Sequence, residues 1–487
     1  MNRLIDENNP SLSIEEYYDQ YIAPKYIKNY ASQHHNICES HEYNFPESKR
    51  TYLLNHHIYS IDPPGCLDAD DAFSLICEND EMCLYIHIAD PTQFIDLKSS
   101  EWSKIKDNMT TRYPSNRLPK HMMSQEIIDF SSLQQNQCGN IKNAISIRFV
   151  IDKETFLPKS NITHMFSKIL VDKSRTLSYN EVDASNCPII ETLLQIAKAL
   201  QFRRCNNTIG NKFSELNCLY VSFQNDLPYL MKDSTHVKAI KNMIAEFAIL
   251  SNSYIASYMK VYCGDLSIFR HCEVDDSFHE KYKNIPQNEL LTQIALDGIC
   301  ANYIKNKSNH DLVGSEHYCH FTSPIRRCVD CVVHYILKYI YFKYVAKRNY
   351  RFPFSSQELD NICCKSNTIS KYLKKLQFDD HKFRFLHALY LQFQHRNFTT
   401  LHMIQYKIQS ITNGFCNIII TQLDQDAIYM SYTLKIVNYP YTLSNDNYDS
   451  IDTNVLRQCV ITHVNPCHRF DEGKIPELDT QIFSLLL

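Results

Sequence analysis

The chain has 487 residues, with 44% hydrophobic residues, 21% charged residues and a formal net charge of −4. This balance is ordinary for a globular protein of two to four domains, and it argues against a generally basic nucleic-acid coat, though not against a local basic channel. No segment is long and apolar enough to cross a bilayer, and the polar N-terminus lacks a signal-peptide core. We therefore expect an intracellular, cytoplasmic protein without membrane contact, whose 19 cysteines are reduced thiols.

The pattern of apolar residues predicts three parts. Residues 1–50 are polar and read as an N-terminal extension, helical near Ser13 to Tyr21. Residues 51–398 begin with strand-like runs rich in branched residues and continue with helical spacing. The strands are expected at 58–61, 73–76, 84–88, 144–151 and 168–171, and the helices at 189–202, at 237–259, after Pro324 and at 356–394.

Residues 399–487 return to short strand-like runs at 403–408, 417–421 and 428–432, which suits a small barrel or sandwich. The helix before this region carries several cations. A solvated face is the simpler interpretation, and a nucleic-acid contact is the alternative. These cations are Lys371, Lys374, Lys375, Lys382 and Arg384.

The most informative segment is an acidic loop between two predicted strands. The first strand ends at Asp62, a Pro-Pro-Gly turn follows, and Asp68, Asp70 and Asp71 precede the next strand. Four carboxylates at this spacing repel one another unless a cation neutralises them. Hard oxygen ligands favour Mg²⁺, with Mn²⁺ as the alternative ion, and Mg²⁺ commonly binds carboxylates together with substrate phosphates.

Two simpler interpretations of the acidic loop are a solvated turn and a calcium loop. An EF-hand counted from Asp68 would need Gly at its sixth position and Glu at its twelfth. Those positions hold Phe73 and Asn79, so the EF-hand is excluded.

The second informative segment runs from His320 to Asp330 and contains Ser323-Pro-Ile-Arg-Arg327. Ser323 is a favourable N-cap and Pro324 a favourable first helical residue, which would place Arg326 and Arg327 in the first turn of a helix. Cations are unfavourable there unless an anion shares the site, so the segment predicts a phosphate site. The alternative is that the arginines pair with carboxylates such as Asp330.

Zinc is not expected in this segment. Cys328 and Cys331 form a single CxxC inside a predicted helix, and no second CxxC accompanies it.

Together, the two segments resemble the ribonuclease II / ribonuclease R (RNB) family. The family's I-D-P, five positions and D-x-D-D-A correspond to Asp62, Asp68, Asp70 and Asp71, and its H-F-T-S-P-I-R-R signature corresponds to His320 onward. The acidic motif looks most similar to the eukaryotic exosome-nuclease branch. Shorter landmarks lie in the same order, at 86–90, 110–113, 177–182, 244–252 and 269–270.

The resemblance implies an α+β fold, with an RNB-type catalytic domain at 51–398, in which helices surround a mixed sheet, and a degenerate OB-like all-β domain at 399–487. It implies a 3′→5′ exoribonuclease that hydrolyses single-stranded RNA to 5′-nucleoside monophosphates. The four aspartates would hold Mg²⁺, Asp70 would be closest to the chemistry, and Arg326 would stabilise charge on the phosphoryl group.

The remaining site residues follow from the same resemblance. Tyr113 would stack on a base, Tyr179 and Glu246 would lie near the ribose, and Ser323 and Arg327 would hold a neighbouring phosphate. For the first three, a core tyrosine or a surface glutamate is the alternative.

The front of the chain departs from the family. Members usually carry two cold-shock barrels before the core, and 50 residues are too few for them, so a protein partner that supplies RNA-guiding domains is expected. The competing functions are a catalytically inactive RNA-binding or protein-interaction module with this fold, and a hydrolase of DNA or short oligonucleotides.

Overall fold

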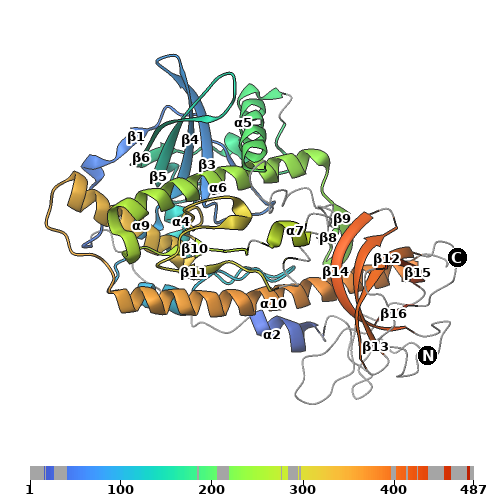
Figure 1. The fold of residues 1–487 in the computed structure, drawn as a ribbon. Helices are drawn as coiled ribbons and strands as arrows, with labels where there is room; N and C mark the ends of the chain where they lie inside the picture. The colour runs from blue at the N-terminus through green and yellow to red at the C-terminus, as the bar shows by residue number, and fades with distance from the viewer. Residues whose placement is uncertain are drawn as a thin grey trace.

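A mixed α/β body and a smaller C-terminal sheet make up the protein (Figure 1). The computed structural model describes residues 16, 18–26, 41–183, 186–205, 219–275, 277–282, 294, 298–395, 402–412, 415–424, 426–436, 455–461 and 480–482. Within this part of the chain, no helix combines the length and apolar character needed to cross a membrane.

The body is built on a five-stranded mixed sheet in the order β1-β6-β5-β4-β3. Neighbouring strands are antiparallel except β1, which runs parallel to β6. The residues of β4 are buried continuously from Cys83 to Ala89, because both faces of the sheet are covered. The strands are β1 (Thr51–Leu53), β3 (Asp71–Glu78), β4 (Glu81–Ala89), β5 (Ile141–Ile151) and β6 (Pro158–Leu170).

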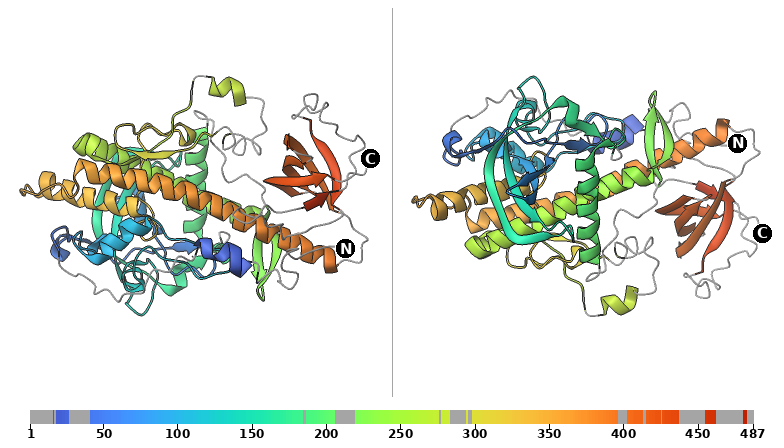
Figure 2. Two further views of the ribbon diagram at one scale, coloured as in Figure 1. Left: turned by 90° about the horizontal axis from the view of Figure 1, so that it is seen from below. Right: turned by 90° about the horizontal axis from the view of Figure 1, so that it is seen from above.

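Long helices form the layer beneath this sheet (Figures 1 and 2). Phe247 of α6 packs against Phe73 of β3, with 5.2 Å between ring centroids. Helix α10 runs along the far side of the layer and extends toward the C-terminal sheet. These helices are α6 (Thr235–Cys263), α9 (Cys328–Ile340) and α10 (Ser356–His395), whereas α5 (Pro188–Cys205) stands beside the sheet and packs against α6.

Every residue of α9 is buried, including an aspartate, a histidine and a lysine. The predicted apolar face is present, but sheet and helices enclose the other face as well. Asp330, His334 and Lys338 therefore need partners inside the protein.

A two-stranded parallel pair carries the acidic loop. Strand β2 (Ser60–Asp62) pairs with β7 (Thr176–Ser178), which places Asp62 opposite Ser178. A β-bridge joins Tyr59 to Phe73, so the beginning of β2 lies beside β3. Residues 63–70 form the connection between these two strands.

The predicted strands and helices of the body are confirmed, but one helix start is wrong. Helix α9 begins at Cys328, and residues 324–326 form a turn before it. Arg327 is extended (φ −135°, ψ 122°) and forms a β-bridge with Thr110. This pairing, made with a segment more than 200 residues away, outweighs the local preference of Pro324 for a helix start.

The sequence patterns also missed a hairpin of β8 (Leu219–Gln224) and β9 (Leu227–Lys232), which packs against α10. Other short elements are π-helix η1 (Tyr18–Ile22), α2 (Ala23–Tyr26), α3 (Ser100–Asn108), α4 (Gln125–Ser131), β10 (Phe269–His271), α7 (Phe278–Tyr282), β11 (Asn302–Ile304) and π-helix η8 (Tyr341–Val345).

Several of the described N-terminal residues belong to the core. Tyr18 and Tyr26 are buried beside α10, and Phe45 stacks on Phe166 of β6 with 4.0 Å between centroids. The predicted helical structure is confirmed at Glu16 and from Tyr18 onward, and it continues to Tyr26, while residues 13–15 and 17 of the prediction lie outside the described residues.

The C-terminal sheet has the order β15-β12-β13-β14-β16. Its apolar residues join one hydrophobic cluster with the second half of α10, for example Ile404 with Phe383 and Leu386. The strands predicted near 403–432 are confirmed. Their bounds are β12 (His402–Thr412), β13 (Phe415–Leu423), β14 (Asp426–Ile436), β15 (Arg457–Ile461) and β16 (Thr480–Ile482).

Candidate active site

Two of the four aspartates lie on adjacent strands. Asp62 ends β2 and accepts a 2.7 Å hydrogen bond from Ser60 Oγ, while Asp71 begins β3. Burial, reinforced by the negative charge of Asp62, raises the pKa of Asp71 to about 7. Burial also raises the pKa of Asp62. In both cases burial is the largest cause, and a neighbouring carboxylate adds to it, Asp62 for Asp71 and Asp68 for Asp62.

The third aspartate is held by a tyrosine. Tyr113 donates its hydroxyl to Asp68 Oδ2 at 2.6 Å, and Cys66 Sγ lies 3.5 Å from the other oxygen. His121 Nδ1 is 3.7 Å from Asp68 Oδ2, and burial lowers the pKa of this imidazole. Sequence reasoning placed Tyr113 at the site as a stacking residue. It missed His121, because a histidine in the loop after Pro119 carries no local signal.

Asp70 joins the acidic loop to the arginine turn. Its Oδ1 accepts the backbone N–H of Ile325 at 2.8 Å, and its Oδ2 accepts Arg326 Nε at 3.1 Å. Burial raises the pKa of Asp70 well above its usual value, and the neighbouring Arg326 offsets only part of that effect. The two motifs are therefore in direct contact although about 250 residues separate them in the sequence.

The two arginines of the turn have different environments. The Arg326 side chain is 47% exposed and also donates to Ser323 Oγ at 2.9 Å. Arg327 pairs with Asp330 at 3.0 Å, and Asp330 accepts the backbone N–H of Ser323 as well. The alternative that the arginines pair with carboxylates is confirmed for both, since Arg326 pairs with Asp70 and Arg327 with Asp330. Ser323 is not the N-cap of α9, because the helix starts five residues later.

Tyr179 lies close to the acidic strands. Its backbone N–H donates to Asp62 O at 3.2 Å. Burial, followed by the charges of Asp62 and Asp71, raises the pKa of its hydroxyl. The ammonium of Lys241 lies 5.4 Å from its ring centroid.

Glu246 is held elsewhere. Its buried carboxylate is paired with Arg204 of α5, with 3.1 Å between Arg204 Nε and Oε2. Among the hydrogen bonds and ion pairs of the described residues, none joins Glu246 to the four aspartates. The structure thus brings Tyr113 and Tyr179 to the acidic cluster but gives Glu246 a different partner.

The donor chemistry of the acidic cluster fits a divalent cation. Four buried or partly buried carboxylates, with raised pKa values at Asp62, Asp70 and Asp71, lie beside the guanidinium of Arg326. Over the described part of the chain, however, no three Asp, Glu, His or Cys side chains are arranged as a ready ligand set. Asp70 would have to exchange a present partner for a metal, whereas Asp68 could offer Oδ1, which has only the weak donor Cys66 beside it, and keep Tyr113 on Oδ2.

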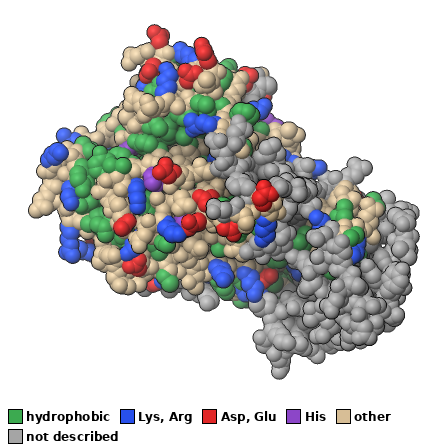
Figure 3. Space-filling view, viewed as in Figure 1, with side chains coloured by type: hydrophobic (Ala, Val, Ile, Leu, Met, Phe, Trp, Pro, Cys, Tyr) green, Lys and Arg blue, Asp and Glu red, His purple; other side chains and the backbone are tan. Residues whose placement is uncertain are grey.

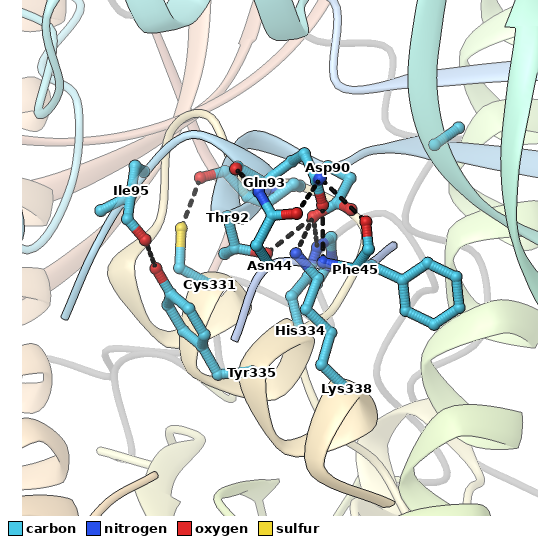
Figure 4. Close-up of polar contacts among 12 residues, drawn as sticks. Asn44, Phe45, Asp90, Thr92, Gln93, Ile95, Cys331, His334, Tyr335 and Lys338 are labelled. Carbon is cyan, nitrogen blue, oxygen red and sulfur yellow. Dashed lines mark hydrogen bonds and ion pairs between the residues drawn. The ribbon is translucent and has the colours of Figure 1, made fainter. Parts of the chain in front are cut away.

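A second buried carboxylate lies behind this site, where β4 ends (Figure 4). Asp90 Oδ2 is 2.8 Å from Arg50 Nη2, and its Oδ1 is 3.0 Å from Lys338 Nζ. His334 Nδ1 lies 3.9 Å from the same Oδ1. Burial alone would raise the pKa of Asp90, but Lys338, His334 and Arg50 outweigh it and hold that pKa well below its usual range.

The Asp90 cluster connects to the acidic loop through the backbone. The residue before it, Ala89, donates its N–H to Asp70 O at 2.9 Å. Lys338 and His334 of the cluster come from α9, whose first turn follows the arginine turn, and Arg50 comes from the residue before β1. The cluster therefore fixes β4 against α9 directly behind the contact between Asp70 and Arg326.

On the molecular surface, acidic and basic side chains are interspersed over the described part of the face in Figure 3. This agrees with a net charge of −4. A polyanion would depend on local groups such as Arg326 rather than on a broad basic surface.

The mixed sheet, the acidic loop and the facing arginine define the class of protein. A model of the RNB domain matches residues 50–343, which is more than half of the 487 residues. The chain belongs to the RNB domain family.

Curated relatives are similar at low identity. Ribonuclease II, chloroplastic/mitochondrial, of Arabidopsis thaliana is 22% identical over 404 residues, covering 79% of this chain and 49% of that protein. The human exosome complex exonuclease RRP44 is 24% identical over 328 residues, covering 58% of this chain and 33% of that protein. The chain spans about half the length or less of these relatives.

Solved structures share the fold. Mycoplasma genitalium RNase R in complex with ribose methylated single-stranded RNA has a TM-score of 0.67 and 16% identity, covering 90% of this chain and 72% of that one. Yeast Ssd1, described as a pseudonuclease, has a TM-score of 0.61 and 18% identity, covering 85% and 55%.

Proposed function

We propose that the protein is a 3′→5′ exoribonuclease that hydrolyses single-stranded RNA to 5′-nucleoside monophosphates with the help of Mg²⁺ or Mn²⁺. The contact between Asp70 and Arg326 carries this proposal, since it places a carboxylate cluster and a phosphate-binding group at one site. Membership of the RNB family and the relatives named as ribonucleases support it.

Asp62, Asp68, Asp70 and Asp71 would hold the metal, which when bound would neutralise the cluster and stabilise the attacking and leaving oxygens. Arg326 would exchange Asp70 for the scissile phosphate, because its half-exposed guanidinium can reach an incoming anion. Electrostatic groups of this kind contribute about 3–4 kcal/mol to transition-state stabilisation.

Tyr113 and Tyr179 would bind the terminal nucleotides. Tyr113 is 38% exposed while its hydroxyl is fixed on Asp68, and a base would stack on its ring. Glu246 would reach a ribose only after Arg204 releases it. Arg327 and Ser323 would support the turn rather than receive phosphate, because Asp330 already holds them.

The path by which RNA arrives is also a proposal. We interpret the C-terminal sheet as a degenerate OB-like domain, and we expect a protein partner to contribute RNA-guiding surfaces. The site of action would be inside the cell, in the cytoplasm.

End-labelled RNA tests the proposal. With Mg²⁺ and 3′- or 5′-labelled single-stranded RNA, the proposal predicts progressive shortening from the 3′ end and release of mononucleotides. Activity that survives EDTA, or intact RNA in the presence of Mg²⁺ and Mn²⁺, would contradict it. DNA of the same sequence serves as the control for the sugar.

A catalytically inactive RNA-binding module is the second candidate. It is favoured by the likeness in fold to a pseudonuclease and by Asp70, both of whose oxygens already have partners. Under this alternative the wild-type protein binds RNA with no turnover. The nuclease proposal predicts instead that Asp70→Asn abolishes turnover and leaves RNA binding intact.

A further inference from the structure

The loop from Tyr113 to Pro119 connects the candidate active site to the N-terminal segment. Two backbone hydrogen bonds between Arg112 and Lys120, of 3.0 and 2.9 Å, close its base. On one side of this base, Thr111 N–H donates to Arg326 O at 3.0 Å. On the other, the loop begins with Tyr113, whose hydroxyl is on Asp68. The loop therefore touches both halves of the site.

The tip of this loop is held by three carboxylates from three separate elements. Ser115 N–H donates to Asp380 of α10 at 2.9 Å. The next residue, Asn116, donates to Asp226 in the turn of the β8–β9 hairpin at 3.2 Å. The residue after that, Arg117, pairs with Asp19 of the N-terminal segment Tyr18–Tyr26.

The N-terminal segment is itself firmly built into the protein. Tyr18 is fully buried, and the guanidinium of Arg384 in α10 lies 3.6 Å from its ring centroid. Arg117 approaches the same ring at 5.2 Å, and the Tyr18 hydroxyl donates to Ser115 O at 3.5 Å. The N-terminal segment therefore contacts the loop at Ser115 and at Arg117. The tip of the loop is otherwise exposed.

We propose that the N-terminal segment Tyr18–Tyr26 is a positioning element of the active site. By fixing the loop at Ser115 and Arg117, it keeps the hydroxyl of Tyr113 on Asp68. This inference rests on the proposed metal site, because it assigns the segment a share in orienting one metal ligand. Groups that orient a metal ligand through a hydrogen bond affect metal affinity nearly as much as some ligands do.

The exposed pair of Arg117 and Asp19 allows a test that leaves the core intact. The two side chains are 34% and 57% exposed, so replacing either one should not unfold the protein. Tyr113→Phe removes only the hydroxyl that reaches Asp68. Glu42→Gln is the matched control, since Glu42 forms a similarly exposed pair with Lys98 away from the loop.

The experiment is a Mn²⁺ titration of the full chain, followed by electron paramagnetic resonance. We expect Tyr113→Phe to weaken Mn²⁺ binding about tenfold. Asp19→Asn and Arg117→Ala should weaken it about threefold, because an exposed pair is a weak interaction. The double variant Asp19→Asn/Tyr113→Phe should bind no more weakly than Tyr113→Phe alone. The reversed pair Asp19→Arg/Arg117→Asp should restore affinity, and Glu42→Gln should leave it unchanged.

Wild-type affinity in both Asp19→Asn and Arg117→Ala overturns the inference. The inference is also overturned if Asp19→Asn weakens Mn²⁺ binding as much in the Tyr113→Phe variant as in wild type. That result would indicate a general structural role for Asp19. A wild-type protein that binds Mn²⁺ but leaves RNA intact contradicts only the nuclease proposal. A wild-type protein that binds no Mn²⁺ contradicts both.

Discussion

Two buried carboxylates a short distance apart, Asp70 and Asp90, have opposite electrostatic environments. Asp90 has Arg50, Lys338 and His334 around it, and its pKa is held well below the usual range. Asp70 has the guanidinium of Arg326 and two neighbouring aspartates, Asp68 and Asp71, and burial raises its pKa. The first is a completed ion cluster that supports the fold. The second is short of positive charge, as expected for a site that receives a cation.

The largest expected effect is on catalysis. Asp70→Asn keeps the shape of the side chain but removes the charge that we assign to metal binding. We predict a fall in kcat on the order of 10⁴-fold. Release of labelled mononucleotides measures this change, and filter binding shows whether RNA affinity persists. A kcat within tenfold of the wild-type value would show that Asp70 is not a catalytic residue.

Substitutions in the Asp90 cluster should lower the free energy of unfolding. Lys338→Met retains the length of the side chain and leaves Asp90 underneutralised, which should cost about 3–5 kcal/mol. Urea unfolding followed by circular dichroism measures the free energy of unfolding. Lys365→Met is the control, because Lys365 pairs with Asp107 at the surface and its loss should cost under about 1 kcal/mol. An equal loss of unfolding free energy in the two variants would show that the buried cluster stabilises the fold no more than a surface ion pair does.

Arg326 contacts Asp70, so its loss should affect catalysis. Arg326→Ala should lower kcat about 10²–10³-fold. It should also raise the pKa of Asp70 further, because it removes the positive charge beside that residue. Steady-state kinetics on a defined single-stranded RNA gives the change in kcat. A variant that alters only KM would assign Arg326 to RNA binding rather than to the chemical step.

The smallest effect is the pH dependence of stability. The pKa of Asp71 is about 7 in the folded protein, above its value in the unfolded chain. Its contribution to stability is therefore present below the unfolded pKa and declines as pH rises through about 7. Without metal, Asp71→Asn should gain on the order of 2 kcal/mol relative to wild type between pH 4 and pH 7. Chemical unfolding at both pH values gives this difference, and saturating Mg²⁺ should reduce it.

The local parts of the fold could be predicted from sequence, and the long-range parts could not. Alternating and helical patterns located most strands and helices, because each pattern lies within one element. The start of α9 was missed because Arg327 pairs with Thr110 in a distant segment. The β8–β9 hairpin was missed because its strands are short and only partly buried.

The candidate site shows the same division. The four aspartates and Arg326 could be named from two contiguous motifs and a family resemblance. The partners that hold them, such as His121 beside Asp68 and Ile325 N–H on Asp70, depend on the tertiary fold. Lys338 gave no signal either, because one lysine in an apolar helix looks like a surface residue until Asp90 is placed beside it.

The most direct test of the account is the position of a bound metal ion. Crystals of the protein soaked in Mn²⁺ can be examined by anomalous diffraction. We expect an anomalous peak bounded by Asp62, Asp68, Asp70 and Asp71, with Arg326 displaced from Asp70 when an RNA end is also bound. A Mn²⁺ peak elsewhere, with these four carboxylates still in their present contacts, would contradict it.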